Sequence, residues 1–271
     1  MKISFYLFCS LSLVSGFLFG ENPDRLFYDA VRAEANGELR NAVQFYKEAT
    51  THSHSANLHG NLANLYFKLE QYGRSILHYR KALLLRPDDR ELKTNLAFAI
   101  EISGIPTEET SQPDSSYSPS HFWGWSLALS LVFWAGIILG ILIIPRAVSK
   151  SSAWALSLLW IALIGYLGWG TYQAHDASTL LAREVIVLEP QTSPSQNEKS
   201  KLIPLRRFAG SGSSANTTVQ PGESLYLDLD ESGKPKAHPN NSGVLWYLAR
   251  SLDGSKKGWL REDEFSKILE N

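Results

Sequence analysis

Three histidines lie close together in the N-terminal half of the chain and could bind a metal ion. His52, His54 and His59 all fall within "THSHSANLH", and imidazole is a common metal ligand. No Asp, Glu or Cys accompanies them in that stretch, and polar residues are ordinary in a turn between helices. We therefore predict no metal and no other cofactor here.

The sequence offers no set of catalytic residues. The acids of "EDEF", Glu262, Asp263 and Glu264, fit a solvated turn better than an acid–base pair. No Ser stands in a nucleophile elbow, and no Gly-rich phosphate loop or zinc motif is present. The single cysteine, Cys9, lies in a segment that we expect to be removed, which excludes disulfides. We predict a protein that is not an enzyme and does not bind nucleic acid.

A row of amides is the best candidate for a binding site. Asn57, Asn61, Asn64 and Lys68 are spaced by 4, 3 and 4 residues, which places them on one face of a helix. Amides both donate and accept hydrogen bonds and so suit a peptide backbone, while Lys could meet a carboxylate. Asn95 repeats the Asn in a later helix. The alternative is an ordinary solvated helix face.

The helices that carry these amides form a repeat. Residues 22–103 have a helical pattern, in which "NGELRNAVQFYKEATTHSHS" is followed by the similar "EQYGRSILHYRKALLLRPDD". Small and aromatic residues recur at one constant spacing, as in the pairs Ala42 and Ser75, Tyr46 and Tyr79, and Ala49 and Ala82. This pattern resembles the tetratricopeptide repeat, an all-α helical array in which about 34 residues form one helix hairpin. The resemblance implies that the amide face lines a concave groove.

Two apolar segments follow. Residues 122–144 and 153–172 contain no Asp, Glu, Lys or Arg and are long enough to span a bilayer. The loop between them, 145–152, carries Arg146 and Lys150, whereas the twenty residues before the first segment carry no Lys or Arg. Because positive residues near membrane ends stay in the cytoplasm, we predict a transmembrane hairpin with a cytoplasmic loop and soluble parts outside.

Gly136 and Gly140 form a small-xxx-small pair in the first apolar segment. Such a pair allows two helix backbones to approach closely, so we predict packing against the second segment, with its Gly165 and Gly168. The alternative is that Gly is simply frequent in membrane spans.

Two further segments complete the plan of the N-terminal part. Residues 1–20 have the form of a secretory signal peptide, with an uncleaved signal anchor as the alternative. Residues 104–121 are rich in Pro, Ser, Thr and acid, and we predict a flexible linker. Together with the hairpin, these features predict a membrane protein with both soluble parts on the extracytoplasmic side.

Residues 179–271 change to short runs rich in Val, Leu, Ile, Tyr and Trp, separated by turn residues, which predicts a small all-β barrel. Pro221, Gly222, Trp246, Gly258 and Trp259 resemble the pattern of the bacterial SH3-like domain. The Gly/Ser-rich stretch 209–218 has no clear counterpart in that family. We predict that both tryptophans belong to the core of the barrel.

The whole arrangement of parts resembles the BatE-type membrane proteins of Bacteroides aerotolerance (Bat) gene clusters. The resemblance implies partners among other Bat membrane proteins with von Willebrand-type domains, and indirectly a MoxR-type ATPase in the cytoplasm. The resemblance also implies a location in the bacterial inner membrane, and we therefore predict a multidomain, non-enzymatic scaffold in contact with the lipid bilayer. The alternative is a protein that binds peptidoglycan or assists envelope assembly.

Overall fold

A computed structural model describes residues 23–105, 121–142, 149–190, 202–239 and 243–269. The chain divides into two compact units, Met1–Ala99 and Ile100–Asn271, and each is described by itself. The predicted signal peptide, nearly all of the predicted linker and the loop residue Arg146 lie outside the described residues. Those three predictions therefore stay predictions.

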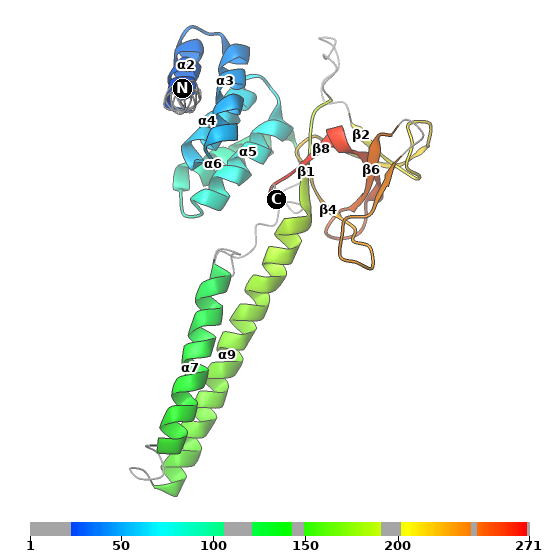
Figure 1. Cartoon of the computed structure of the whole chain (residues 1–271). Coiled ribbons are helices and arrows are strands. Elements are labelled where there is room, and N and C mark those ends of the chain that lie inside the picture. Colours follow the sequence, from blue (N-terminus) through cyan, green and yellow to red (C-terminus); the bar gives the residue numbers. More distant parts are fainter. Residues whose placement is uncertain (1–22, 106–120, 143–148, 191–201, 240–242, 270–271) are drawn as a thin grey trace, which may run out of the picture. The chain divides into compact units, whose positions relative to one another are not determined.

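The first unit is built from antiparallel helices, as predicted (Figure 1). The helix α2 packs against α3, α4 packs against α5, and α3 joins the two pairs by packing against α4. The helix α6 follows α5 and crosses the boundary of the unit. The helices are α2 (Pro23–Ala35), α3 (Leu39–His52), α4 (Ala56–Lys68), α5 (Tyr72–Leu85) and α6 (Arg90–Ser103).

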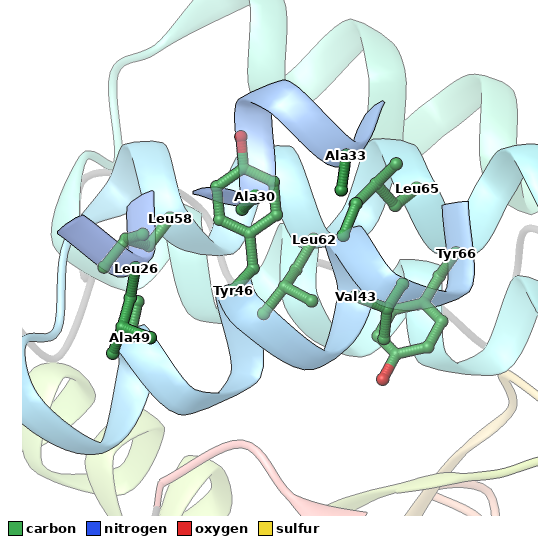
Figure 2. Packing of buried hydrophobic residues seen from close by; sticks show 11 residues of the cluster. Leu26, Ala30, Ala33, Val43, Tyr46, Ala49, Leu58, Leu62, Leu65 and Tyr66 are labelled. Atoms are coloured by element: carbon green, nitrogen blue, oxygen red, sulfur yellow. The ribbon is translucent and has the colours of Figure 1, made fainter. Parts of the chain in front are cut away.

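The residues that recur in the sequence are the ones that pack between the helices. Tyr46 of α3 is 1% exposed and lies in one cluster with Ala30 of α2 and Leu62 of α4 (Figure 2). A tyrosine ring fits here because small residues leave room for it in a closely packed interior. The residues on which the repeat was predicted are all buried, namely Ala42, Tyr46, Ala49, Ser75, Tyr79 and Ala82.

The same period extends to the turns and helix ends. Gly37, between α2 and α3, has φ 80°, and Glu70, which stands at the equivalent position between α4 and α5, has φ 58°. This left-handed conformation is unfavourable for a residue with a side chain. Glu70 adopts it nevertheless, because the turn between α4 and α5 has the same geometry as the turn at Gly37. The Ser55 hydroxyl caps α4 by accepting from the Leu58 amide at 3.2 Å, and the Asp89 carboxylate accepts from the Leu92 amide at 3.2 Å at the start of α6.

The second unit begins with two packed apolar helices, α7 (Phe122–Leu142) and α9 (Lys150–Arg183). Both are long and apolar enough to cross a membrane, with mean hydropathies of 1.9 and 1.5. The second helix does not end at Tyr172, where the predicted span ends. It continues to Arg183, because residues 173–183 contain neither Gly nor Pro to stop it.

The helix α9 passes directly into the first strand, which begins at Glu184. The predicted boundary of the C-terminal region at residue 179 therefore falls inside the helix, and the β structure starts five residues later. Arg183, the last helical residue, holds the junction because its Nε donates to the Leu227 carbonyl of the sheet at 3.0 Å.

The C-terminal part consists of β-strands, as predicted, and these form an antiparallel sheet (Figure 1). The strand order is β3-β2-β7-β6-β4-β1-β8, with β5 also paired to β6, and the pairings among described residues do not join β3 to β8. A closed barrel thus stays a prediction. The strands are β1 (Glu184–Val187), β2 (Ile203–Arg206), β3 (Ala215–Val219), β4 (Ser224–Leu227), β5 (Ala237–Pro239), β6 (Leu245–Arg250), β7 (Lys257–Arg261) and β8 (Phe265–Lys267).

The sheet buries one apolar face, and the two tryptophans lie on the other. Ala249 and Leu260 belong to the core cluster, so the alternation of side chains along a strand places Trp246 and Trp259 on the opposite face. Trp246 is nevertheless only 1% exposed, and the Arg206 guanidinium stands 5.7 Å from the centre of its ring. Trp259 is half-buried. Trp246 is therefore a buried core residue, as predicted, although it lies on the opposite face of the sheet from the main cluster, whereas Trp259 is only partly buried.

The Gly/Ser-rich stretch 209–218 belongs to a hairpin at one edge of the sheet. Strands β2 and β3 form a hairpin, and residues 207–214 make its turn, with the Arg207 amide donating to the Ser214 carbonyl at 3.0 Å. The stretch predicted as an insertion, 209–218, is therefore part turn and part strand.

Candidate functional site

The amide row lies on α4 and is bonded to the neighbouring helices. Asn61 Nδ2 donates to the Tyr46 hydroxyl at 3.2 Å, and the Tyr79 hydroxyl donates to Asn64 Oδ1 at 2.5 Å. The structure thus places each of these two amides against one of the two tyrosines of the repeat. Each amide is held by one bond and keeps further hydrogen-bonding capacity.

The remaining candidates have different surroundings. Lys68 Nζ forms a 2.8 Å ion pair with Glu34 of α2, and Arg86 donates to the Asn57 side chain. Asn95 is half-buried on α6. The structure therefore brings Asn61, Asn64 and Lys68 onto one face of α4 and connects that face to α2, while the binding role of all five residues stays a prediction.

The repeat period shows which residues flank the amides on the adjacent helices. Asn61 and Asn64 correspond to Tyr28 and Val31 of α2, one repeat earlier, and Asn64 corresponds to Phe98 of α6, one repeat later. These apolar side chains are exposed, at 70% for Tyr28, 43% for Val31 and 51% for Phe98. Equivalent positions of stacked repeats share a face. We define the groove face by these positions, as Tyr28, Val31, Asn61, Asn64, Lys68, Asn95 and Phe98.

Electrostatics keep both tyrosines protonated. Burial, with a smaller contribution from Glu34, raises the pKa of Tyr46 above its ordinary value. Burial, with a smaller contribution from Glu91, raises the pKa of Tyr79 to about 12. Both hydroxyls therefore stay neutral at physiological pH and can keep their bonds to the amides. From the sequence, Tyr46 and Tyr79 were interpreted only as packing residues, and their bonds to the amides were missed. Their recurrence in both repeats was the one sequence feature that could have drawn attention to them.

The three histidines considered as possible metal ligands have different surroundings in the structure. His52 and His54 are exposed, whereas His59 is 5% exposed and pairs with His78 of α5, with 3.1 Å between the two Nδ1 atoms. Among the described residues, no three His, Cys, Asp or Glu side chains are grouped as they would be around a metal ion. Sequence reasoning missed His78, because its closeness to His59 depends on how α4 packs on α5.

The three acids near the C-terminus form a short 3₁₀ turn, η4 (Glu262–Glu264), and two of them, Asp263 and Glu264, interact with Arg261. The Arg261 guanidinium binds the Asp263 carboxylate, with 2.7 Å between Nη2 and Oδ2, and the Arg261 amide donates to Glu264 Oε2 at 2.9 Å. Burial raises the pKa of Glu264. These contacts fit the interpretation of a turn.

Two glycines of the apolar helices, Gly136 and Gly170, are packed against tryptophans. A Cβ on Gly136 of α7 would overlap the indole of Trp160 on α9, and a Cβ on Gly170 of α9 would overlap Trp125 of α7. The Trp160 Nε1 also donates to the Val132 carbonyl at 3.0 Å. Apart from the adjacent residues and backbone of its own helix, no described atom lies within 4 Å of a Cβ on Gly140, Gly165 or Gly168. The role of Gly136 and Gly140 in a membrane stays a prediction.

Comparison with known proteins identifies one part of the chain. The family model described as tetratricopeptide repeat matches residues 56–89, which begin with α4 and end just after α5. No match is found among curated proteins. The helix pair that carries the amide row is thus a tetratricopeptide repeat, and repeats of this kind indicate a role in protein–protein interaction.

Proposed function

We propose that the chain is a non-enzymatic membrane scaffold whose helical array binds an extended segment of a partner protein. The observation that carries this proposal is the tetratricopeptide repeat at residues 56–89, whose first helix presents Asn61, Asn64 and Lys68 on one face. The bonds to Tyr46 and Tyr79 hold two of these side chains in place. A binding face that is already ordered loses less entropy when a ligand arrives.

The composition of the groove face favours an extended peptide. Amides in the middle of the face can pair with the N–H and C=O groups of a peptide backbone. The exposed Tyr28 and Val31 on one side and Phe98 on the other can cover apolar side chains of the same segment. Phe98 is supported by Phe67 of α4, with 5.4 Å between the ring centres.

The proposed setting is the bacterial inner membrane, with α7 and α9 as its spans and both soluble parts outside the cytoplasm. Support comes from the length and composition of the two helices and from Arg146 and Lys150 between them. In this setting residues 1–20 act as a signal peptide or anchor. Two proteins confined to one membrane meet at high effective concentration, so modest affinity in the groove is sufficient.

The proposed partners follow from the resemblance to BatE-type proteins. They are membrane proteins of a Bat-type complex that carry von Willebrand-type domains, together with a MoxR-type ATPase that acts from the cytoplasmic side. The supporting features are the order of the parts and the repeat itself. A MoxR-type ATPase gene beside the gene for this chain would strengthen the assignment.

Replacing Lys68 and Asn95 together with alanine is expected to reduce recovery of the partner at least about tenfold, since two polar contacts would be lost. Partner recovery is measured by mass spectrometry after affinity purification of the full chain from native membranes. These two positions are chosen because Lys68 holds only an exposed ion pair, which contributes little to stability. Asn64 is avoided because its loss would leave the buried Tyr79 hydroxyl without its partner.

The matched control is Arg40→Ala with Gln44→Ala, which removes one cation and one amide from exposed positions of α3. It should leave partner recovery unchanged. Equal recovery by the groove variant and by unaltered protein would show that the groove face is not the contact.

A reporter that is active only in the cytoplasm tests the proposed topology. Inserted between Val148 and Ser149, next to Lys150, it is expected to be active, since the positive loop stays inside. At Ser116 or after Asn271 it is expected to be silent. Whole-cell reporter activity at comparable expression is the measurement. Activity at Ser116 would contradict the arrangement of both soluble parts.

A second function, binding of peptidoglycan by the C-terminal sheet, is favoured by one observation. Trp259 is half-buried on the face opposite the core, with the His238 ring 6.4 Å away, so its ring is open to a ligand. Aromatic rings with polar neighbours are common in binding sites. Retention of the full chain on purified peptidoglycan, by a variant that no longer retains protein partners, would favour this function.

A further inference from the structure

Two histidines form a direct contact between α4 and α5. His59 of α4 and His78 of α5 lie with their rings 5.3 Å apart and nearly parallel, and their Nδ1 atoms are 3.1 Å apart. The ring of His54 stacks on His59 at 6.1 Å, and the ring of Tyr66 stacks on His78 at 5.4 Å. The pair is therefore the centre of a run of four stacked rings.

This contact depends on the protonation state of the pair. A hydrogen bond between two Nδ1 atoms needs one ring to donate its N–H and the other to accept with a lone pair. A doubly protonated pair offers two donors and no acceptor, and it places two like charges side by side. The bond can therefore exist only while at least one ring is neutral.

The surroundings disfavour protonation further. Besides His59, the charged groups with the largest effect on His78 are all cationic, namely Lys81 and Arg74 of α5 and Lys47 of α3. Burial of the ring and these positive charges lower the pKa of His78 well below its ordinary value of 6.5. The neutral form of His78 is thus the form that the folded array accommodates.

We propose that the His59–His78 pair is an acid-sensitive switch that holds α4 against α5 while at least one ring is neutral and releases them when both rings are protonated. The inference concerns the array itself and does not rest on the proposed binding role. It bears on that role because the Tyr79–Asn64 bond also joins α5 to α4, so opening of this helix pair removes an ordered residue of the groove face.

The direction of the pH effect follows from proton linkage. Above pH 6.5, His78 is neutral in both the folded and the unfolded chain, so it adds no pH dependence. Below that value the unfolded chain binds a proton that the folded array does not, and the equilibrium shifts toward the open form. The equilibrium constant for opening is expected to rise about tenfold for each pH unit, down to the lowered pKa of the folded array.

The test is hydrogen exchange of the full chain in detergent, without a partner, at several values between about pH 7.5 and about pH 5. Peptides from α4 and α5 are followed by mass spectrometry, and rates are corrected for the intrinsic effect of pH on exchange. Protection of these peptides should fall about tenfold per unit below pH 6.5. Because no partner is present, the result is independent of whether the groove face binds one.

Three variants assign the effect to the pair. His78→Gln and His78→Phe should both abolish the pH dependence, the first with a side chain that can still form a hydrogen bond and the second with a ring that can still stack on Tyr66. His52→Gln, at an exposed position of α3, should behave like the unaltered chain. Protection that does not change with pH, or a slope that survives in either His78 variant, would overturn the proposal.

Discussion

Replacing Trp246 with alanine is expected to unfold the C-terminal sheet. Its side chain is the largest of those that are almost fully buried, and its removal leaves a void that the strands cannot close. Removal of a buried aromatic ring typically costs about 3–5 kcal/mol, a large fraction of the roughly 5–15 kcal/mol by which native domains are stable. The Arg206 guanidinium would also lose the ring beside it. Pulse proteolysis of the full chain across a urea series should show cleavage in β4, β6 and β7 at much lower urea.

Trp259→Ala is the matched control, since it removes the same side chain from the adjacent strand of the same sheet face. Trp259 of β7 pairs with Leu248 of β6, and Trp246 stands two residues before Leu248 in the same strand. The two tryptophans are therefore close neighbours on one face of the sheet. Because Trp259 is half-buried, its loss should cost clearly less. Equal urea midpoints for the two variants would mean that burial of Trp246 does not stabilise the sheet.

Replacing Gly136 with alanine is expected to separate α7 from α9. The added Cβ would overlap the Trp160 indole, so the ring must move and its 3.0 Å bond to the Val132 carbonyl must break. Overpacking of this kind typically costs about 1–3 kcal/mol, and the lost hydrogen bond adds about 1 kcal/mol. Six of the eight tryptophans belong to these two helices, so tryptophan fluorescence in mixed micelles with rising SDS reports mainly on them. The variant should unfold at a lower SDS fraction.

Gly140→Ala is the control, because it adds the same methyl group one helical turn later, where no described atom of the facing helix lies within 4 Å. It should leave the SDS midpoint unchanged. Gly170→Ala, which would overlap Trp125, should behave like Gly136→Ala. A loss of stability in Gly140→Ala as large as in Gly136→Ala would show that the cost arises from the helix itself and not from its contact with Trp160.

The helical array could be predicted in detail because the residues that pack its helices together recur at a regular spacing in the sequence. Tyr46 and Tyr79 recur with the small residues beside them, and the same period relates Gly37 to Glu70, although their residue types differ. A period identifies equivalent positions without any knowledge of the contacts. It could therefore show which residues share a face, including the amides of α4.

The contacts of those residues could not be predicted in the same way. That Asn61 bonds to Tyr46 and that His59 meets His78 depends on the distance between two helices, which the order of residues does not specify. The tryptophans of the sheet show the same limit. Trp246 and Trp259 stand in apolar runs, but which face of the strand is buried is set by the register of β6 and β7. Hydropathy marks only the apolar stretch of α9, so it could not show that the helix itself continues to Arg183.

The helix α9 continues into the strand β1 without an intervening loop. Because no loop separates Arg183 from Glu184, the direction in which the sheet faces depends on the number of residues in α9. One inserted residue would turn the sheet by about 100° and advance it by about 1.5 Å, whereas seven, close to two full turns, would nearly restore its direction while adding about 10 Å of reach. The direction of the sheet around the axis of α9 repeats with each helical turn, whereas its distance along the axis grows with every residue. Insertions between Gln173 and Arg183 could therefore lengthen the helix while nearly keeping the direction of the sheet.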